Sequence, residues 1–372
     1  MKKGLETKQL TVGYGKKVVI HNVELCVVPG KILTLIGKNG SGKSTILKSI
    51  IGQLKPLGGS VILCGKETNR MKESDIAKEL SMVMTEPVHP ELMTCKDVVA
   101  TGRYPYTGRF GILSKDDWRA VEEAITLVHA NDVENLEFCK ISDGQKQRIM
   151  LARAICQETN VLVLDEPTSY LDMRYKLDIL SSIRRLAHER DMAVIMSLHE
   201  LDLAQKVSDT IACVKGDKLD KVGAPEEIFT GDYVQNLYGV AEKSFHPLLG
   251  MMQLPPNEGA PKVFVIGGGG DAIPVYYRLQ RENIPFVAGI LYENDIEYAV
   301  AKSLASDVVA EQAFFPIKEE TVQMAKEKMD SCEKCICTIE TFGPYNQANE
   351  ELLSYAKKTK KLISVSQLDC IS

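Results

Sequence analysis

The sequence lacks an excess of positive charge and lacks any long hydrophobic run. Its 45 Lys and Arg residues are outnumbered by 50 Asp and Glu, which gives a formal net charge of -5 at pH 7. Such a chain presents no overall positive field to nucleic acid or to an anionic membrane surface. No apolar run approaches the roughly 18 residues that span a bilayer, and no apolar segment follows the lysines near the start. We therefore expect a soluble, cytoplasmic protein whose main partner is not nucleic acid.

Internal repeats, low-complexity tracts and a secretion signal are also missing. Without a secretion signal, the ten cysteines do not indicate a disulfide framework. Cys26, Cys64 and Cys213 stand among apolar neighbours, so we expect reduced thiols in the core and no structural disulfide.

The length of 372 residues favours two domains. Apolar runs at Val161–Leu164 and Ala193–Ser197 have the pattern of buried parallel strands, which indicates an α/β domain over residues 1–243. A stretch rich in proline over residues 244–261 predicts a linker. Strand and helix patterns then resume, so residues 262–372 are predicted to form a second, smaller α/β domain.

Further elements are predicted from hydrophobic spacing. In the first domain we expect strands within residues 5–36 and helices at Ser114–Ala130, after Asp143 and at Arg174–Arg190; in the second we expect strands at Lys262–Ile266, Phe286–Leu291 and Cys335–Ile339.

A glycine-rich loop between the apolar strand Ile32–Ile36 and an apolar helix fits the P-loop pattern. Its glycines let successive N–H groups point at one anion, while Lys43 brings positive charge to the β- and γ-phosphates and Ser44 offers a hydroxyl to magnesium. The predicted ATP-binding residues here are Gly37, Asn39, Gly40, Ser41, Gly42, Lys43, Ser44 and Thr45.

Two carboxylates follow the predicted strand Val161–Leu164. Asp165 stands where it can hold magnesium or a water bound to it, and Glu166 where it can act as base for an attacking water. With a P-loop upstream, a metal and catalytic role is favoured over a surface loop that starts with two acids.

Between these motifs, the segment Ile141–Arg148 reads ISDGQKQR and resembles the LSGGQ signature of ABC ATPases. Ser169–Asp172 resembles the family's D-loop and His199 its switch histidine. The resemblance covers about residues 5–240. It implies a P-loop ABC-type ATPase domain with antiparallel β and helical subdomains, with ATP and Mg²⁺ as cofactors.

The resemblance also implies roles for individual residues. Lys43, Glu166 and His199 would be catalytic. Ser142, Gly144, Gln145 and Asp172 would contact ATP held by a second subunit. Tyr14 would stack on the adenine, and Glu86 stands where the family has a glutamine that touches magnesium, so the metal set would be Ser44, Asp165 and Glu86. Asp143 replaces the usual second glycine of the signature, with an open effect on affinity.

The segment Val99–Tyr106, followed by Leu113 and Ser114, is similar to the ATPases of iron-siderophore, haem and cobalamin importers. This resemblance implies a homodimer that works with membrane permease subunits and an extracytoplasmic substrate-binding protein, peripheral on the inner face of the cell membrane. The alternative is a soluble ABC ATPase regulated by a ligand-binding C-terminal domain.

The second domain begins with a Rossmann-like pattern. Gly267–Ala272 fits G-x-G-x-x-A after a strand, and Glu293 lies where an acid could meet a ribose hydroxyl. Dinucleotide binding and a plain strand-to-helix turn both remain open. The cluster Cys332, Cys335 and Cys337 lacks a fourth ligand nearby, so cysteines along a buried strand are favoured over a metal site.

Overall fold

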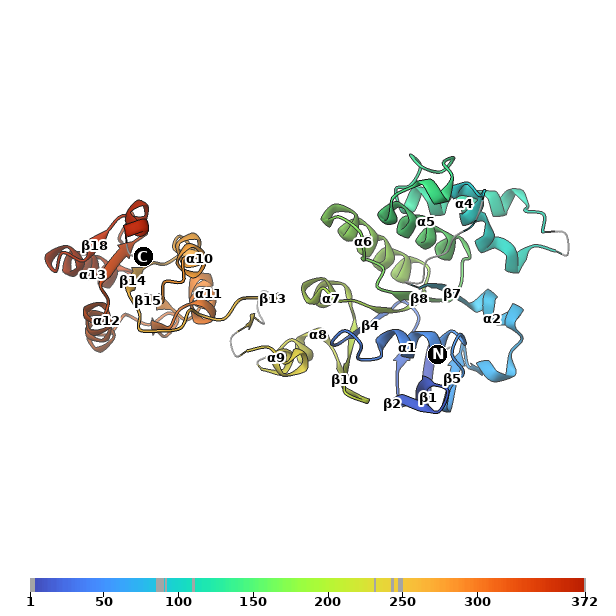
Figure 1. Cartoon of the computed structure of the whole chain (residues 1–372), viewed down its shortest axis with the longest axis horizontal. Coiled ribbons are helices and arrows are strands. Elements are labelled where there is room, and N and C mark those ends of the chain that lie inside the picture. The colour runs from blue at the N-terminus through green and yellow to red at the C-terminus, as the bar shows by residue number, and fades with distance from the viewer. Residues whose placement is uncertain are drawn as a thin grey trace. The chain divides into compact units, whose positions relative to one another are not determined.

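The computed structural model describes residues 4–84, 90, 92–108, 111–230, 232–241, 244–246 and 250–370. The chain divides into two compact units, Met1–Thr230 and Gly231–Ser372, and each is described by itself (Figure 1). None of the described helices is long and apolar enough to cross a bilayer.

Unit 1 is built around one curved sheet, in which the order is β6-β5-β1-β2-β11-β10-β4-β9-β8-β7, and β3 also pairs with β1. Strands β10, β4, β9, β8 and β7 run parallel, whereas β1 pairs antiparallel with β2, β3 and β5. The strands are β1 (Leu5–Tyr14), β2 (Lys17–Val23), β3 (Cys26–Val27), β4 (Ile32–Ile36), β5 (Gly58–Leu63), β6 (Lys66–Glu67), β7 (Leu80–Val83), β8 (Val161–Asp165), β9 (Ala193–Ser197), β10 (Thr210–Lys215) and β11 (Lys218–Gly223).

The helices of unit 1 include a group, α3, α4 and α5, that packs together. They are α1 (Lys43–Ile50), α2 (Glu73–Glu79), α3 (Cys95–Ala100), α4 (Lys115–Leu127), α5 (Asp143–Cys156), α6 (Met173–Glu189), α7 (Leu201–Val207) and α8 (Pro225–Ile228), with a 3₁₀ turn η2 (Thr101–Tyr106). The predicted strands β8 and β9 and helices α4, α5 and α6 are confirmed. The central strands β4, β8 and β9 are buried along their whole length, which is why they read as continuous apolar runs.

Unit 2 contains a parallel five-stranded sheet in the order β16-β15-β14-β17-β18. Its described elements are α9 (Tyr233–Tyr238), β12 (Phe245–His246), β13 (Met251–Met252), β14 (Val263–Ile266), α10 (Ile273–Arg281), β15 (Phe286–Tyr292), α11 (Ile296–Leu304), β16 (Asp307–Glu311), α12 (Glu319–Ser331), β17 (Lys334–Cys337), α13 (Gln347–Lys358) and β18 (Leu362–Ile363). Strands β12 and β13 pair antiparallel within the segment that the sequence predicts to be an irregular linker, so that prediction was wrong in this detail.

Two separate cores lie on the two faces of this sheet. Val263 and Val265 of β14 pack with α10 and α11, whereas Phe264 and Ile266 pack with α12 and α13. This alternation along one strand is what a sheet covered on both faces requires.

The nine cysteines whose side chains the structure describes form no disulfide. Cys213 is buried as predicted, but Cys26 is exposed. Its strand neighbour Val27 takes the buried side, because successive side chains of a strand point to opposite faces. In unit 2, Cys332 and Cys335 are buried, and among the described residues no group of His, Cys, Asp and Glu could hold a metal ion.

Candidate nucleotide-binding site

The glycine-rich loop connects the buried strand β4 to helix α1. Gly40 and Gly42 have φ of 75° and 99°, in the left-handed region that side chains rarely adopt. A Cβ at Gly42 would lie 2.7 Å from Cδ1 of Ile20, so close packing also requires glycine here. The loop therefore curls tightly before the N-terminus of α1, an arrangement that favours a bound anion.

Lys43 begins α1 and is only 4% exposed. Its Nζ donates to the carbonyl oxygens of Gly37 at 2.8 Å and Lys38 at 3.1 Å, which holds the amine across the loop. Burial lowers the pKa of Lys43, and the carboxylates of Glu166 and Asp165 oppose this shift. The Lys43 amine is thus a buried donor near two carboxylates. A phosphate, which carries more negative charge, would be a stronger partner for this amine.

Asp165 at the end of β8 is fully buried. Its Oδ1 accepts hydrogen bonds from Ser44 Oγ at 3.1 Å and from Ser197 Oγ at 2.7 Å. Ser197 also accepts a hydrogen bond from the N–H of Glu166 at 2.9 Å. Ser197, at the end of β9, therefore fixes both acids, although the sequence analysis did not select it as a site residue; its one signal was its position at the end of a buried strand.

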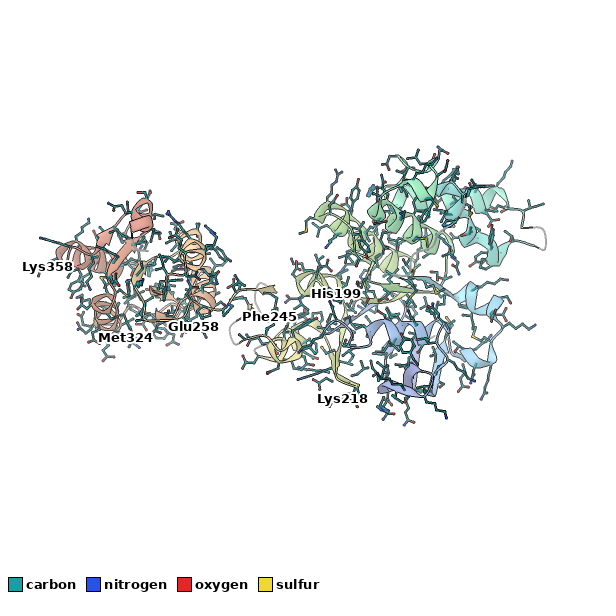
Figure 2. The ribbon with its side chains drawn as sticks, viewed as in Figure 1. His199, Lys218, Phe245, Glu258, Met324 and Lys358 are labelled. Carbon is teal, nitrogen blue, oxygen red and sulfur yellow. The ribbon has the colours of Figure 1, made fainter. Side chains whose placement is uncertain are left out.

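Glu166 and His199 lie against each other, with 2.6 Å between Oε1 and Nε2. Oε2 of Glu166 accepts a hydrogen bond from Ser169 Oγ at 3.1 Å. The backbone of Glu166 has φ of 50°, a strained conformation for this residue type that is held by its neighbours. His199, labelled in Figure 2, comes just before α7, so two strand ends bring an acid and a histidine together.

These groups open onto a cavity of about 530 Å³. Its lining includes Tyr14, Lys17, the loop Asn39–Thr45, Glu166 and His199. The volume and the donor-rich loop suit a nucleotide. Ser41 Oγ is buried without a hydrogen-bond partner among the described residues, a donor that a phosphate oxygen would satisfy.

A magnesium ion fits the donor set as well. The hydroxyl of Ser44 and the carboxylate of Asp165 are hard oxygen groups held 3.1 Å apart next to the loop. The predicted third ligand, Glu86, lies outside the described residues.

The residues predicted to contact ATP held by a second subunit are Ser142, Gly144, Gln145 and Asp172. None of them lines this cavity. Ser142 caps α5 through a reciprocal pair of bonds with Gln145, so the helix begins at Asp143, earlier than predicted. A Cβ at Gly144 would lie 2.9 Å from the carbonyl oxygen of Tyr170, and Asp172 caps α6. The exposed helix start that results could meet a phosphate on another molecule.

Asp143 forms an ion pair with Lys146 at 3.0 Å. In the segment Val99–Tyr106, Arg103 is only 8% exposed and pairs with Asp117 at 2.8 Å and with Glu158 at 2.7 Å. Arg103 also donates to the carbonyl oxygen of Cys156 at 2.8 Å, so it ties η2 to α4 and to the end of α5. The exposed side chains of this segment are those of Tyr104 and Tyr106.

The glycine-rich loop of unit 2 is occupied by the protein itself. Glu297 is fully buried, and its Oε2 accepts hydrogen bonds from the N–H groups of Gly268 at 3.0 Å, Gly270 at 3.1 Å and Ala272 at 3.2 Å. Asp295 Oδ2 accepts from Gly269 N at 2.7 Å. The amides that would bind a pyrophosphate are already satisfied, so the loop does not support dinucleotide binding.

Comparison with known proteins matches residues 20–169 to the ABC transporter family model and residues 286–370 to the model of the MJ0874 family. The chain is 41% identical over 288 residues to an uncharacterized ABC transporter ATP-binding protein, MJ0873, of Methanocaldococcus jannaschii, with 77% of this chain and 99% of the relative covered. It is 35% identical over 236 residues to the iron(3+)-hydroxamate import ATP-binding protein FhuC of Bacillus subtilis, with 63% and 88% covered.

Among solved structures, the fold is similar to a chain from an ABC transporter described as metal-chelate type, in an inward-facing conformation. The TM-score is 0.55 at 25% identity, and the match covers 63% of this chain and 88% of that one.

Proposed function

Because this chain belongs to the ATP-binding proteins of ABC transporters, we propose that it drives import of a metal chelate through a separate membrane permease. The substrate would be an iron-siderophore, haem or cobalamin-like compound. Support comes from the iron(3+)-hydroxamate importer relative and the metal-chelate type transporter in the comparisons. The observation that carries the ATPase assignment is the contact of Glu166 with His199 beside the P-loop.

In this mechanism, each residue acts on ATP as substrate. Lys43 neutralises charge that develops on the β- and γ-phosphates, because its amine is already held at the loop. Glu166 orients the attacking water and accepts its proton, and His199 fixes the Glu166 carboxylate. Tyr14, half exposed at the cavity, stacks on the adenine. Ser44 and Asp165 would hold Mg²⁺, which would supply positive charge that neutralises the phosphates.

Two copies complete each site. Ser142, Gly144, Gln145 and Asp172 do not line the cavity of their own chain, so their exposed helix starts would close over ATP bound to a partner copy. The assembly would be a homodimer on the cytoplasmic face of the membrane, bound to permease subunits and supplied by an extracytoplasmic substrate-binding protein.

The test is to capture tagged Glu166→Gln protein with ATP from native membranes and to identify what accompanies it. We expect tight ATP binding, loss of hydrolysis by at least about 100-fold, and co-purification of a permease with a chelate-binding protein. Vesicles containing that assembly should then take up the chelate only with the wild-type ATPase.

The matched control is Glu189→Gln, at the end of α6 and outside the residues that line the cavity; it should hydrolyse ATP as the wild type does. If the Glu166→Gln protein binds ATP but repeatedly brings no membrane protein with it, the importer proposal is wrong and a soluble ABC ATPase governed by unit 2 becomes the better explanation.

A further inference from the structure

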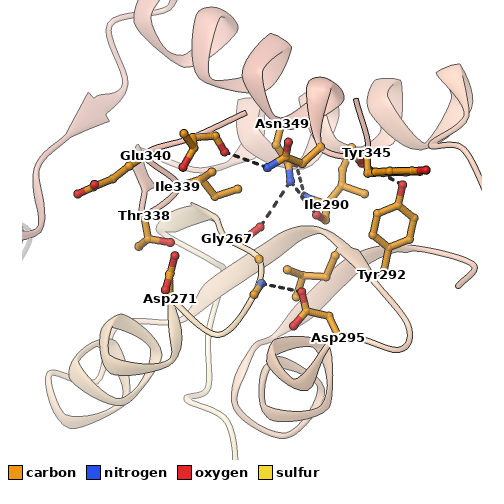
Figure 3. Close-up of a pocket in the computed structure, with 15 residues that line it drawn as sticks. Gly267, Asp271, Ile290, Tyr292, Asp295, Thr338, Ile339, Glu340, Tyr345 and Asn349 are labelled. Carbon is orange, nitrogen blue, oxygen red and sulfur yellow. Dashed lines mark hydrogen bonds between the residues drawn. The ribbon is translucent and has the colours of Figure 1, made fainter. Parts of the chain in front are cut away.

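Unit 2 contains a cavity of about 750 Å³ at the carboxyl edge of its parallel sheet (Figure 3). The chain proceeds from β14 to β15 and β16 on one side, and returns to β17 and β18 on the other. The segments Gly267–Gly269 after β14 and Thr338–Thr341 after β17 both line the cavity. This is the topological switch point, where open α/β sheets bind their ligands.

The cavity differs from a phosphate-binding crevice in its available donors. The N–H groups of its glycine-rich loop donate to Glu297 and Asp295. A phosphate placed there would find the N–H groups of Gly268, Gly269, Gly270 and Ala272 already bonded and would face these two carboxylates. The loop therefore shapes the cavity without making it attractive to an anion.

The charged groups that line the cavity are acidic. Asp271, Asp295 and Glu340 are among its lining residues, and no lysine, arginine or histidine is found among the described residues that line it. Asp271 and Glu340 are exposed, and neither forms a hydrogen bond or an ion pair with another described residue. Because no group of three or more described His, Cys, Asp and Glu residues could hold a metal ion, Asp271, Asp295 and Glu340 do not form a metal site, and the charge of this lining suits an organic cation better.

Aromatic rings complete the lining. Tyr292 and Tyr345 are lining residues that lie beside each other in Figure 3, and the Tyr292 hydroxyl donates to the carbonyl oxygen of Tyr345 at 3.0 Å. The same two tyrosines line a neighbouring hollow of about 650 Å³ with Phe314 and Phe315. Phe314 is 91% exposed and has φ of 67°, a strained conformation that presents its ring to solvent. Aromatic faces attract cations and pack against flat apolar groups.

We propose that this switch-point cavity binds a small organic amine whose ammonium group contacts Asp271 and Glu340 and whose aromatic or apolar body packs on Tyr292 and Tyr345. This ligand site is separate from the ATP site and does not depend on which substrate the transporter imports.

The test uses three probes of matched shape and different charge: tyramine, 3-(4-hydroxyphenyl)propanamide and 3-(4-hydroxyphenyl)propanoate. Binding to the full-length protein is measured by titration calorimetry with the nucleotide site saturated with ADP and Mg²⁺. Tyramine should bind with a Kd on the order of 1 mM, typical of a fragment of its size. The neutral amide should bind about threefold or more weakly, and the propanoate should not bind detectably.

The double variant Asp271→Asn, Glu340→Gln should reduce tyramine affinity at least about fivefold and remove the preference over the amide. The side chains of Asp271 and Glu340 form no hydrogen bond or ion pair with other described residues, so the double variant should fold as the wild type does. Glu320→Gln, a change on α12 away from the cavity lining, is the matched control and should leave binding unchanged. Equal binding of the amide, binding of the propanoate or of NAD⁺, or no saturable tyramine binding in the millimolar range would each overturn the proposal.

Discussion

At the scale of single residues, Ser197 is the least conspicuous member of the ATP site and one of its main organisers. It bonds to the Asp165 carboxylate and to the backbone N–H of Glu166. We therefore propose that Ser197 positions Asp165, the proposed metal ligand, and Glu166, the proposed base.

We predict that Ser197→Ala lowers kcat for ATP hydrolysis about tenfold, because loss of one buried hydrogen-bonding group costs roughly 1 to 2 kcal/mol. KM for ATP should change little, since Lys43 and the P-loop amides remain in place. Steady-state kinetics separate these quantities, and Ser197→Thr should restore most of the rate. A raised KM with normal kcat would instead assign Ser197 to nucleotide binding.

Glu297 is the residue-scale feature that organises unit 2. Its Oε1 accepts a hydrogen bond from the Tyr276 hydroxyl at 2.7 Å, in addition to the three amides of the glycine-rich loop. We predict that Glu297→Ala lowers the free energy of unfolding of unit 2 by about 3 kcal/mol, because buried donors lose their acceptor. Urea denaturation followed by the tyrosine signal measures this, with Asp271→Ala as a neutral control.

The pH dependence of this site has a definite sign. Burial raises the pKa of Glu297 above its usual value of 4.5, while hydrogen bonds from Tyr276 and Ala272 oppose the shift. When the pKa of Glu297 is higher in the folded state than in the unfolded state, its contribution to the free energy of unfolding is complete below pH 4.5. This contribution is lost as the pH rises through the pKa of the folded state. Wild type should therefore gain stability relative to Glu297→Gln as pH falls from 7 towards 4.5; an opposite trend would contradict a raised pKa.

At the scale of elements, α4 is fixed by one carboxylate with two roles. Asp117 accepts hydrogen bonds from the N–H and Oγ of Ser114, which closes the capping box of α4, and it pairs with the buried Arg103 of η2. One side chain thus joins the start of a helix to its neighbouring turn.

We predict that Asp117→Asn destabilises unit 1 by about 2 kcal/mol at neutral pH, because Arg103 keeps Glu158 but loses its second acid. Hydrogen bonds from Ser114, followed by Arg103, lower the pKa of Asp117 below 3.8. The contribution of the Asp117 carboxylate to the free energy of unfolding is complete above pH 3.8. It is lost as the pH falls through the lower pKa that Asp117 has in the folded state. The difference between wild type and variant in thermal or urea unfolding should shrink in that acid range; a constant difference would show a purely steric effect.

At the scale of the whole molecule, the proposed homodimer can be tested by mixing two inactive proteins. Lys43→Ala removes the P-loop charge, and Ser142→Glu places a negative charge on the surface proposed to meet ATP of the partner copy, at the start of α5. In a mixed dimer both defects fall in one composite site, and the other site is intact.

An equal mixture should therefore recover about one quarter of wild-type ATPase activity, since half of randomly formed dimers are mixed and each has one working site. Each variant alone should be inactive. Mixing Lys43→Ala with Lys43→Ala, Ser142→Glu is the control and should recover nothing. Failure of the first mixture to exceed its components, with dimers shown by light scattering, would place all catalytic groups in one chain.

The sequence by itself determined the features that are contiguous along the chain. The P-loop, the acids after β8 and the buried strands could be recognised because glycine backbone freedom, strand periodicity and motif order are local properties. Membership of the ABC family followed from the same motifs.

Only the tertiary structure decided which distant groups meet. Ser197 reaches Asp165 across two neighbouring strands, Arg103 turns inward to two acids, and Glu297 fills a loop that reads as a phosphate site. Each outcome depends on burial, because a polar group removed from water must find a partner wherever the fold places one. A linear pattern shows which donors and acceptors a segment carries, but their partners are chosen by the packing of strands and helices that lie far apart in the sequence.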